Sequence, residues 1–370
     1  MPDAKYRVAV IGDTKRGRYG HGLDTCWLAM PEAEIVGVSD PDPAGRAAAG
    51  KRLRTKNLFS DYRELLDQTK PQIAAICPRW LDQHREMFFA CAQRGIHMFM
   101  EKPMCPDLEQ ADEMIAAAEK HDVKLAMAHQ TRYSPRLDAV RKLIPDGAIG
   151  KVLELQARGK EDSRRGGGED LWVLGSHMMN LIHTLGGEPD SCFATVKQGG
   201  QRVTREHVKP GNEGIGPLAG DNIFAQYEMA DGVMATFGSQ RAVGGRPSRF
   251  GLQIYGSKGI IEILSGYMPE VWILQDVAWS PGRSKKEWLP VSSAGINQPE
   301  PLQMKDPRTT GNVHICRDLI AAINDDRDPE CSIHEGRWTV EMIAAIFESH
   351  RLNAPVTFPL KERRNPLSLL

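Results

Sequence analysis

Short apolar runs alternate with amphipathic segments along the first 130 residues. The runs with the length and composition of strands are Arg7–Ile11, Glu34–Ser39, Ile73–Cys77, His97–Met100 and Leu125–Ala128. The segments with apolar residues at helical spacing are Asp61–Gln68, Gln83–Gln93 and Asp107–Lys120. Strands that alternate with helices predict βαβ units, and right-handed crossovers between them give a doubly wound parallel sheet.

The pattern changes after Gln130 and becomes richer in strands. A helix is expected over Leu137–Leu143 and a strand over Val152–Arg158. Two hairpins are expected, Ile223–Met229 with Val233–Phe237 and Arg249–Tyr255 with Ile260–Ile263, and they indicate an antiparallel sheet. The other expected elements are helices over Asn312–Ile323 and Glu335–Ser349 and loops over Lys209–Gly220 and Ser280–Pro307. We therefore predict two domains, residues 1–130 and 131–370.

Composition excludes several classes of protein. The 370 residues carry 47 Lys and Arg against 48 Asp and Glu, so no basic excess favours nucleic acid as a partner. No apolar run reaches the roughly 18–20 residues of a membrane helix. The charged N-terminus is not followed by the apolar core of a signal peptide. Seven cysteines without a CxxC pair fit a reducing compartment, and we expect a cytoplasmic location.

A glycine-rich loop follows the first strand, and a helix is expected after it. Glycines in this position let backbone N–H groups approach a pyrophosphate. Gly12 and Gly17 fit that role, but Asp13 and Thr14 stand where the middle glycine of the usual fingerprint would fall. A purely structural turn is the competing interpretation.

Asp40 at the end of the second strand strengthens the nucleotide interpretation. An acidic residue there accepts hydrogen bonds from the adenosine ribose and repels a 2′-phosphate, which favours NAD over NADP. Asp42 is a competing candidate, and Arg46 leaves some room for a phosphate.

The fourth strand runs directly into Glu101-Lys102-Pro103. Ligands bind at the carboxyl ends of parallel strands, so Lys102 lies where a substrate would. Burial beside a cationic nicotinamide would lower the pKa of such a lysine toward a range useful for proton transfer. A solvated surface lysine is the alternative.

At these residues the chain resembles the Gfo/Idh/MocA oxidoreductases over nearly its whole length. The matching segments are Val8–Gly12, Asp40, Pro78, Gly95–His97, Glu101–Pro103, Arg132-Tyr133, Ile149–Lys151, Gly175–His177, Ile254–Gly259 and Glu348-Ser349. The resemblance implies a Rossmann domain of α/β class that binds NAD(P). It also implies an α+β C-terminal domain whose open, mostly antiparallel sheet covers the nicotinamide and forms a dimer or tetramer.

The resemblance also assigns roles to single residues. Lys102 is expected to bind the reacting hydroxyl and His177 to take or relay its proton, so both are expected to be catalytic. Besides the glycine loop and Asp40, the expected cofactor-binding residues are Pro78, Arg79, His84, Glu101, Lys102 and Gln130.

One departure concerns the helix that carries His177. Many dehydrogenases of the family have an aspartate four residues before the histidine, where this chain has Val173, and Asn180 replaces another common aspartate. Asp170 would take the place of the missing aspartate only if its loop folds back toward His177.

Several side chains are candidates for the substrate pocket. Arg164 and Arg165 lie in a charged, glycine-rich loop and suit a bidentate clamp on an anion, although a solvated loop is the alternative. The other candidates are Arg132, Tyr133, Asp170, Trp172, His177 and Asn180. No metal site is expected, because His177 and His183 do not share a helix face.

Together these features predict an NAD-dependent enzyme that moves hydride between nicotinamide and a secondary hydroxyl of a sugar, polyol or glycoside. Two alternatives stay open. One is a glycosidase that oxidises its substrate transiently and eliminates the glycosidic bond. The other is a non-catalytic regulator that binds nucleotide and sugar.

Overall fold

The computed structural model describes residues 5–370, which form two compact units. Unit 1 comprises the described residues up to Gln130 together with 212–216 and 306–340. Unit 2 comprises residues 131–211, 217–305 and 341–370.

The centre of unit 1 is a six-stranded sheet in the order β3-β2-β1-β4-β5-β6. Its strands are β1 (Tyr6–Ile11), β2 (Ala33–Ser39), β3 (Leu58–Phe59), β4 (Ile73–Ile76), β5 (His97–Met100) and β6 (Leu125–Met127). All neighbouring strands pair in parallel, which confirms the doubly wound fold of Rossmann type. Strand β1 is buried from Val8 to Ile11, as a strand covered on both faces should be.

Helices connect these strands, and their first turns show why they begin where they do. They are α1 (Pro43–Leu53), α2 (Tyr62–Thr69), α3 (His84–Ala92) and α4 (Leu108–His121). The side chains of Asp42, Asp61 and Asp107 accept hydrogen bonds from backbone N–H groups at the starts of α1, α2 and α4. The buried residues of α1 are Ala49, Gly50 and Leu53, too few and too small to form a clear apolar stripe, and the sequence pattern did not reveal this helix.

The helix expected after the glycine-rich loop is absent, so that prediction was wrong. Residues 12–25 form turns, followed only by the short 3-10 helix η1 (Cys26–Ala29). Gly17, Gly20 and Gly22 have φ values of 88°, 60° and 85°. Left-handed backbone at three nearby positions is incompatible with an α-helix.

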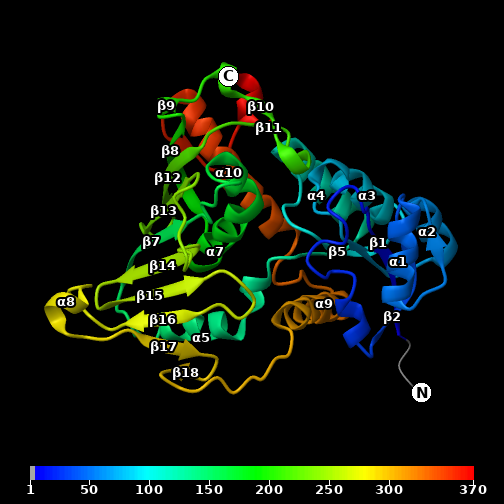
Figure 1. Cartoon of the computed structure of the whole chain (residues 1–370), viewed down its shortest axis with the longest axis horizontal. Coiled ribbons are helices and arrows are strands. Elements are labelled where there is room, and N and C mark those ends of the chain that lie inside the picture. The colour runs from blue at the N-terminus through cyan, green and yellow to red at the C-terminus, as the bar shows by residue number, and fades with distance from the viewer. Residues whose placement is uncertain (1–4) are drawn as a thin grey trace. The chain divides into compact units, whose positions relative to one another are not determined.

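A late segment of the chain completes unit 1. Helix α9 (Pro307–Asp325) packs against η1, β5 and β6, and Figure 1 shows the orange helix beside the dark blue N-terminal segment. The Sγ atoms of Cys26 in η1 and Cys316 in α9 lie 3.7 Å apart. Part of the core of unit 1 is therefore built from residues far apart in sequence.

Unit 2 is built on one large sheet in the order β18-β17-β16-β15-β14-β7-β13-β12-β8-β19, with β9 paired to β8. Its strands are β7 (Val152–Arg158), β8 (Pro189–Gln198), β9 (Gln201–Arg202), β12 (Asn222–Met229), β13 (Met234–Gln240), β14 (Gly251–Gly256), β15 (Gly259–Leu264), β16 (Val271–Leu274), β17 (Leu289–Ser292), β18 (Gly295–Ile296) and β19 (Val356–Thr357). The β12–β13 and β14–β15 hairpins confirm both expected hairpins. Strands β7 and β13 pair in parallel, so the sheet is mixed but mostly antiparallel, as expected.

Two segments expected as loops contain regular structure. Residues 209–220 hold the short paired strands β10 (Lys209–Pro210) and β11 (Pro217–Leu218). Residues 280–307 hold helix α8 (Pro281–Ser284) and the strands β17 and β18. Prolines and glycines make these strands short, which hid them in the sequence pattern.

The remaining helices include a long helical run that carries His177. Unit 2 contains α5 (Pro135–Leu143), α6 (Gly168–Asp170), the π-helical turn η4 (Leu171–Gly175) and α7 (Ser176–Gly186), while α10 (Ile333–Leu352) passes from unit 1 into unit 2. Short 3-10 turns are η2 (Leu81–Gln83), η3 (Gln130–Tyr133), η5 (Arg205–His207), η6 (Asn212–Gly214) and η7 (Pro366–Leu369). Helix α7 packs on β7, β13 and β14. The end of α10 is fixed to β8, where the backbone N–H groups of Ala194 and Val196 donate to Ser349 and His350.

Candidate functional site

The strand order of unit 1 reverses between β1 and β4. Open α/β sheets bind ligands outside the carboxyl ends of their strands at such a switch point. The loops after β1, β2, β4 and β5 lie at this edge because all the strands are parallel. The loop residues Gly12, Asp13, Thr14 and Gly17, with Asp40, Pro78, Arg79, Glu101 and Lys102, follow these strand ends.

The loop after β1 is a small, tightly packed turn. Asp13 and Arg18 form an isolated antiparallel bridge, and the Nε atom of Arg79 donates to the carbonyl of Gly17 at 3.2 Å. A Cβ atom on Gly17 would lie 2.7 Å from the backbone nitrogen of Arg79, so only glycine fits there. The exposed residues Lys15 and Arg18 place two cations on this loop.

Asp40 is buried and holds the loop to β2. Its carboxylate accepts hydrogen bonds from the Thr14 backbone N–H at 3.2 Å and from the Thr14 hydroxyl at 2.7 Å. It also accepts from the Tyr19 hydroxyl at 2.9 Å and from the Asp42 backbone N–H at 3.0 Å. Both carboxylate oxygens are therefore engaged within unit 1, so a ribose hydroxyl would have to share or replace one of these donors.

Tyr19 occupies the space beside Gly12. A Cβ atom on Gly12 would lie 2.1 Å from Cε1 of the Tyr19 ring. The Arg52 guanidinium lies over the Tyr19 ring, 4.6 Å from its centroid. Tyr19 thus packs directly against the start of the loop at Gly12.

Glu101 connects the loop after β1 to Lys102. It is 1% exposed, its Oε1 atom accepts a hydrogen bond from Nδ1 of His21, and its Oε2 atom accepts from the Lys102 backbone N–H at 2.8 Å. Burial alone raises the pKa of the Glu101 carboxyl. The charges and hydrogen bonds of His21 and Lys102 outweigh burial and hold that pKa at about 2. Glu101 is therefore an anion beside Lys102 at neutral pH.

Gln130 and Asn312 extend this network. The Gln130 side chain donates to the Asn312 side-chain oxygen, and Asn312 donates to the His21 carbonyl at 3.1 Å. Asn312 is fully buried and comes from α9. A residue from the late helix thus supports the loop that carries His21.

His84 is fully buried and contacts the backbone that follows β4 and β5. Its Nε2 atom lies 2.7 Å from the Pro78 carbonyl, and its Nδ1 atom lies 3.1 Å from the Pro103 carbonyl. Burial lowers the pKa of His84, although its backbone hydrogen bonds act in the opposite direction. His84 joins the ends of β4 and β5, so its influence on a ligand would pass through Pro78 and Pro103.

Unit 2 holds the remaining candidate residues. His177 is the second residue of α7, directly after the π-helical turn that contains Trp172 and Val173. Single π turns of this kind are frequent at functional sites. Asn180 is 2% exposed in the same helix, and Arg132 donates to the Thr184 hydroxyl at 2.9 Å.

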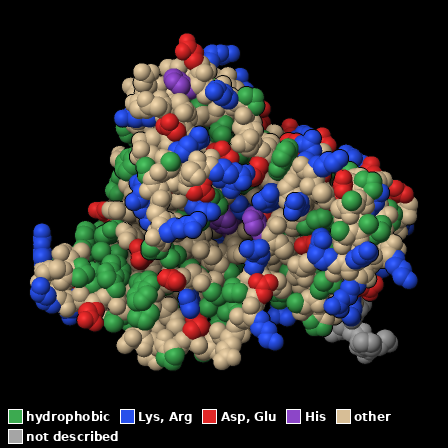
Figure 2. Space-filling model, in the orientation of Figure 1, with side chains coloured by type: hydrophobic (Ala, Val, Ile, Leu, Met, Phe, Trp, Pro, Cys, Tyr) green, Lys and Arg blue, Asp and Glu red, His purple; other side chains and the backbone are tan. Residues whose placement is uncertain are grey.

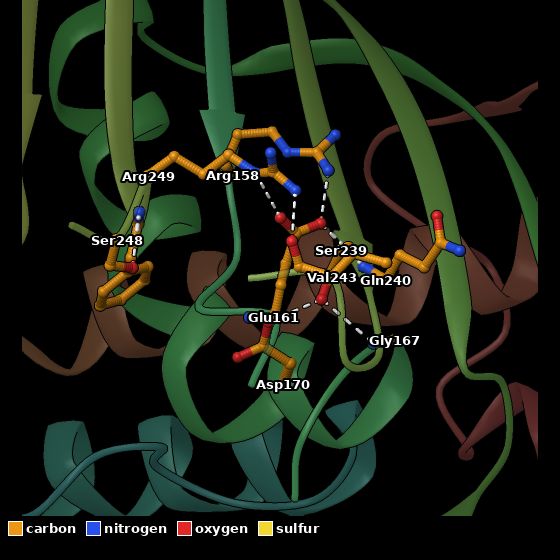
Figure 3. Close-up of polar contacts among 10 residues, drawn as sticks. Arg158, Glu161, Gly167, Asp170, Ser239, Gln240, Val243, Ser248 and Arg249 are labelled. Carbon is orange, nitrogen blue, oxygen red and sulfur yellow. Dashed lines mark hydrogen bonds and ion pairs between the residues drawn. The ribbon is translucent and has the colours of Figure 1, made fainter. Parts of the chain in front are cut away.

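Asp170 does not project from a loop but lies in the first turn of this helical run. Its Oδ2 atom accepts from the Ser239 hydroxyl at 2.6 Å and from the Glu161 backbone N–H at 3.1 Å (Figure 3). The same serine oxygen accepts from the Gly167 backbone N–H at 3.1 Å. Burial raises the pKa of Asp170, and the side chain is fully inaccessible to solvent. Asp170 therefore fixes the segment before α6 to β13.

The other substrate candidates differ in accessibility. Tyr133 and Trp172 are 8% and 1% exposed, so neither ring is open on the surface. Arg164 is exposed, and Arg165 forms an ion pair with Glu169 at 3.6 Å.

Sequence reasoning missed His21, Tyr19, Asn312 and Glu161, which make key contacts in the two units. Only the position of His21 and Tyr19 inside the glycine-rich loop was a usable signal. Among residues 5–370, no group of three or more His, Cys, Asp or Glu side chains could hold a metal ion. In the same range, no helix is long and apolar enough to cross a membrane.

The doubly wound sheet, its glycine-containing loop and the acid after β2 are those of a dinucleotide-binding protein. Residues 6–129 match the model described as oxidoreductase family, NAD-binding Rossmann fold, and residues 141–358 match its C-terminal alpha/beta domain. The chain therefore belongs to the Gfo/Idh/MocA oxidoreductase family, which confirms the resemblance seen in the sequence.

Similar proteins include dehydrogenases of sugars and polyols. Levoglucosan dehydrogenase of Pseudarthrobacter phenanthrenivorans is 24% identical over 63% of this chain, and the match spans 65% of that protein, just under two thirds. Myo-inositol 2-dehydrogenase of Thermotoga maritima is 26% identical over 69% of this chain and 74% of its own.

Solved structures share the fold over almost the entire chain. A levoglucosan dehydrogenase in complex with NADH and L-sorbose has a TM-score of 0.76 at 20% identity and covers 96% of this chain and 100% of its own. An oxidoreductase from Agrobacterium radiobacter in complex with NAD+, L-tartaric acid and magnesium has a TM-score of 0.70 at 16% identity and covers 96% and 98%.

Proposed function

We propose that this protein is a dehydrogenase that uses a nicotinamide dinucleotide to oxidise a secondary hydroxyl of a sugar, polyol or glycoside. The observation that carries this proposal is the placement of Lys102. It follows β5 at the ligand-binding edge of the sheet and is held by the buried Glu101 anion. The named activities of levoglucosan and inositol dehydrogenases support a sugar or polyol substrate.

The residues at the edge of unit 1 fit a dinucleotide. The close approach of Gly17 to Arg79 keeps the loop tight, and the exposed residues Lys15 and Arg18 supply positive charge for a diphosphate. When bound, the nicotinamide ring supplies the hydride acceptor. Lys102 holds the reacting hydroxyl, and His177 accepts its proton as the carbonyl forms. Pro78, Arg79 and Gln130 are proposed to contact the cofactor.

The test is a substrate panel followed by NADH absorbance. Levoglucosan, myo-inositol and a set of neutral and acidic sugars are offered to the full-length protein with NAD. Formation of NADH with at least one of them supports the proposal. Binding of NADH without turnover of any panel member would contradict it and favour the non-catalytic regulator. Cleavage of a glycoside without net NADH would favour the glycosidase, although no observation on residues 5–370 favours either alternative.

We further propose that NAD is preferred over NADP. Asp40 and Asp42 place two carboxylates at the end of β2, where the adenosine 2′-position lies in such folds. Like charges repel, so kcat/KM with NAD is expected to exceed that with NADP by about tenfold or more. Asp40→Asn should lower the ratio of kcat/KM with NAD to kcat/KM with NADP. Asp146→Asn on the exposed surface should leave this ratio unchanged. Equal use of both cofactors by the unaltered protein would refute the preference.

We also propose a homo-oligomer, a dimer or tetramer, formed through the sheet of unit 2, in a cytoplasmic location. Phe193, Phe224 and Met234 are 39%, 53% and 37% exposed on adjacent strands. Figure 2 shows further hydrophobic side chains gathered over β14–β17. Light scattering on the purified protein gives the oligomeric mass.

The proposed cytoplasmic location is supported by the cysteines. All seven cysteines are free and buried, as suits a reducing compartment.

A further inference from the structure

Two loops of unit 2 are joined at the ends of neighbouring strands. We call them the β7 loop (residues 159–167), which leads into the His177 helix, and the β13 loop (residues 241–250). The Gly244 backbone N–H donates to the Glu161 carbonyl at 2.8 Å, and the Ala242 backbone N–H donates to the Asp162 carbonyl at 3.2 Å. A Cβ atom on Gly166 would lie 2.1 Å from Cα of Arg241. The two loops therefore pack as one body.

Glu161 is the centre of this joint and is fully buried. Its carboxylate accepts hydrogen bonds from Arg158, from Nε of Arg249 at 2.8 Å and from the Gln240 backbone N–H at 2.9 Å (Figure 3). The negative charge of Glu161 is thus neutralised by arginines from both sides.

Both loops contain strained backbone at their contact. Glu161 has a φ of 59° and Ala242 a φ of 61°, values that side chains other than glycine rarely adopt. Such positions persist only where surrounding contacts enforce them, and they gather at ligand-binding sites.

A pocket of about 490 Å³ lies between the two loops, within the usual size of small-molecule sites. It is lined by Lys160, Glu161, Asp162, Ser163, Ala242, Gly244, Gly245, Arg246 and Ser248. Both acids of the lining are engaged. Glu161 binds the two arginines, while Asp162 accepts from the Arg165 backbone N–H at 2.6 Å and lies 3.7 Å from the Lys160 ammonium.

Of the two cations that line the pocket, Lys160 lies beside Asp162, and Arg246 differs from it. The β13 loop carries Arg241, Arg246 and Arg249 and no acidic residue. Among residues 5–370, no side chain forms a hydrogen bond or ion pair with the guanidinium of Arg246. Ser163 and Ser248 add hydroxyl groups of the kind that bind sugar hydroxyls. A pocket with an unpaired arginine and hydroxyl groups suits an anionic carbohydrate.

We propose that this pocket binds the anionic group of an acidic sugar, a carboxylate or a phosphate, through Arg246. That this ligand is a substrate rests on the proposed function, whereas its binding to the pocket does not. The inference narrows the substrate class of the dehydrogenase to sugar acids and sugar phosphates. It adds Arg246 of the β13 loop to Arg164 and Arg165, which the sequence suggests as an anion clamp.

The experiment compares D-glucuronate, D-glucose 6-phosphate and D-glucose as probes of the full-length protein with saturating NADH. Binding is followed by ligand-observed NMR titration at low ionic strength. At least one anion should bind about tenfold or more tightly than glucose, and added salt should weaken the anion alone. The anion that binds more tightly than glucose indicates whether the pocket binds a carboxylate or a phosphate.

Arg246→Gln should remove the advantage of the anion and leave glucose binding unchanged, while Arg246→Lys should retain part of it. Arg283→Gln, an exposed arginine of α8, is the matched control and should change nothing. Equal binding of glucose and both anions, no binding of either anion, or equal behaviour of the Arg246→Gln and Arg283→Gln proteins would overturn the proposal. Anion binding without NADH formation would uphold the pocket and refute the dehydrogenase. Oxidation of neutral sugars that is unaffected by Arg246→Gln would uphold the dehydrogenase and refute the pocket as its substrate site.

Discussion

Replacing Lys102 with alanine is expected to abolish NAD-dependent turnover while NADH still binds. Lys102 follows β5 at the ligand-binding edge, and its backbone is fixed by Glu101 at 2.8 Å. A positioned proton-transfer group contributes about 10²–10⁴-fold to a rate, so kcat should fall by at least about a hundredfold. The cofactor phosphates and ribose are proposed to bind at the loops after β1 and β2, so the dissociation constant of NADH should change little. Steady-state kinetics and NADH fluorescence titration measure the two quantities.

The matched control is Lys120→Ala in the last turn of α4, where the side chain is exposed. This variant should keep the activity of the unaltered protein. Undiminished turnover in the Lys102→Ala protein would remove Lys102 from the mechanism. Loss of NADH binding in that protein would show that its main task is to hold the cofactor.

Glu101→Gln is expected to lower both stability and kcat. The amide keeps the shape of the side chain but cannot remain an anion between His21 and Lys102. Hydrogen bonds to charged groups contribute about 1.5–3 kcal/mol, and water partly screens His21, so we expect a loss near 2 kcal/mol. kcat should also fall because Lys102 loses the neighbouring negative charge of Glu101. Chemical denaturation with and without His21→Leu gives the coupling energy between Glu101 and His21.

The pH dependence of stability gives a second test of Glu101. Its pKa is about 2 in the folded protein against an ordinary value of 4.5. A depressed carboxyl pKa contributes stability that is complete above the unfolded value and disappears as pH falls toward the folded value. The Glu101→Gln protein should therefore lose less stability than the unaltered protein between about pH 4.5 and pH 2. An exposed control, Glu109→Gln in α4, should follow the unaltered protein, and an identical curve for Glu101→Gln would contradict the assignment.

Local patterns predicted most of the parallel sheet because buried strands of this fold read as apolar runs. His97–Met100 was placed at its observed bounds, and Asp107 caps α4 as expected. The missing first helix is a different case, since three left-handed glycines decide the backbone there. Strands β8 and β16 were also missed. The exposed Phe193 interrupts the alternation of polar and apolar residues in β8, and β16 is a short apolar run without alternation.

The candidate site was predicted where chemistry follows directly from chain position. Lys102 and Asp40 come straight after strands, so the parallel sheet alone brings them to one edge. His21 and Asn312 needed knowledge of packing across almost 300 residues. Glu161 and Arg246 lie in loops whose joint depends on the neighbouring ends of β7 and β13, which pair in parallel despite their separation in sequence.

The contribution of α9 to unit 1 has a consequence for protein synthesis. The six parallel strands leave the ribosome early, but the residues that cover η1 and hold Asn312 against His21 follow only after residue 306. Most of unit 2 is translated in between. Domains generally fold as units during synthesis, and transiently exposed apolar surface invites aggregation. The nascent nucleotide-binding unit must therefore wait, with buried residues such as Trp27 still open to chaperones, until the last sixth of the chain arrives.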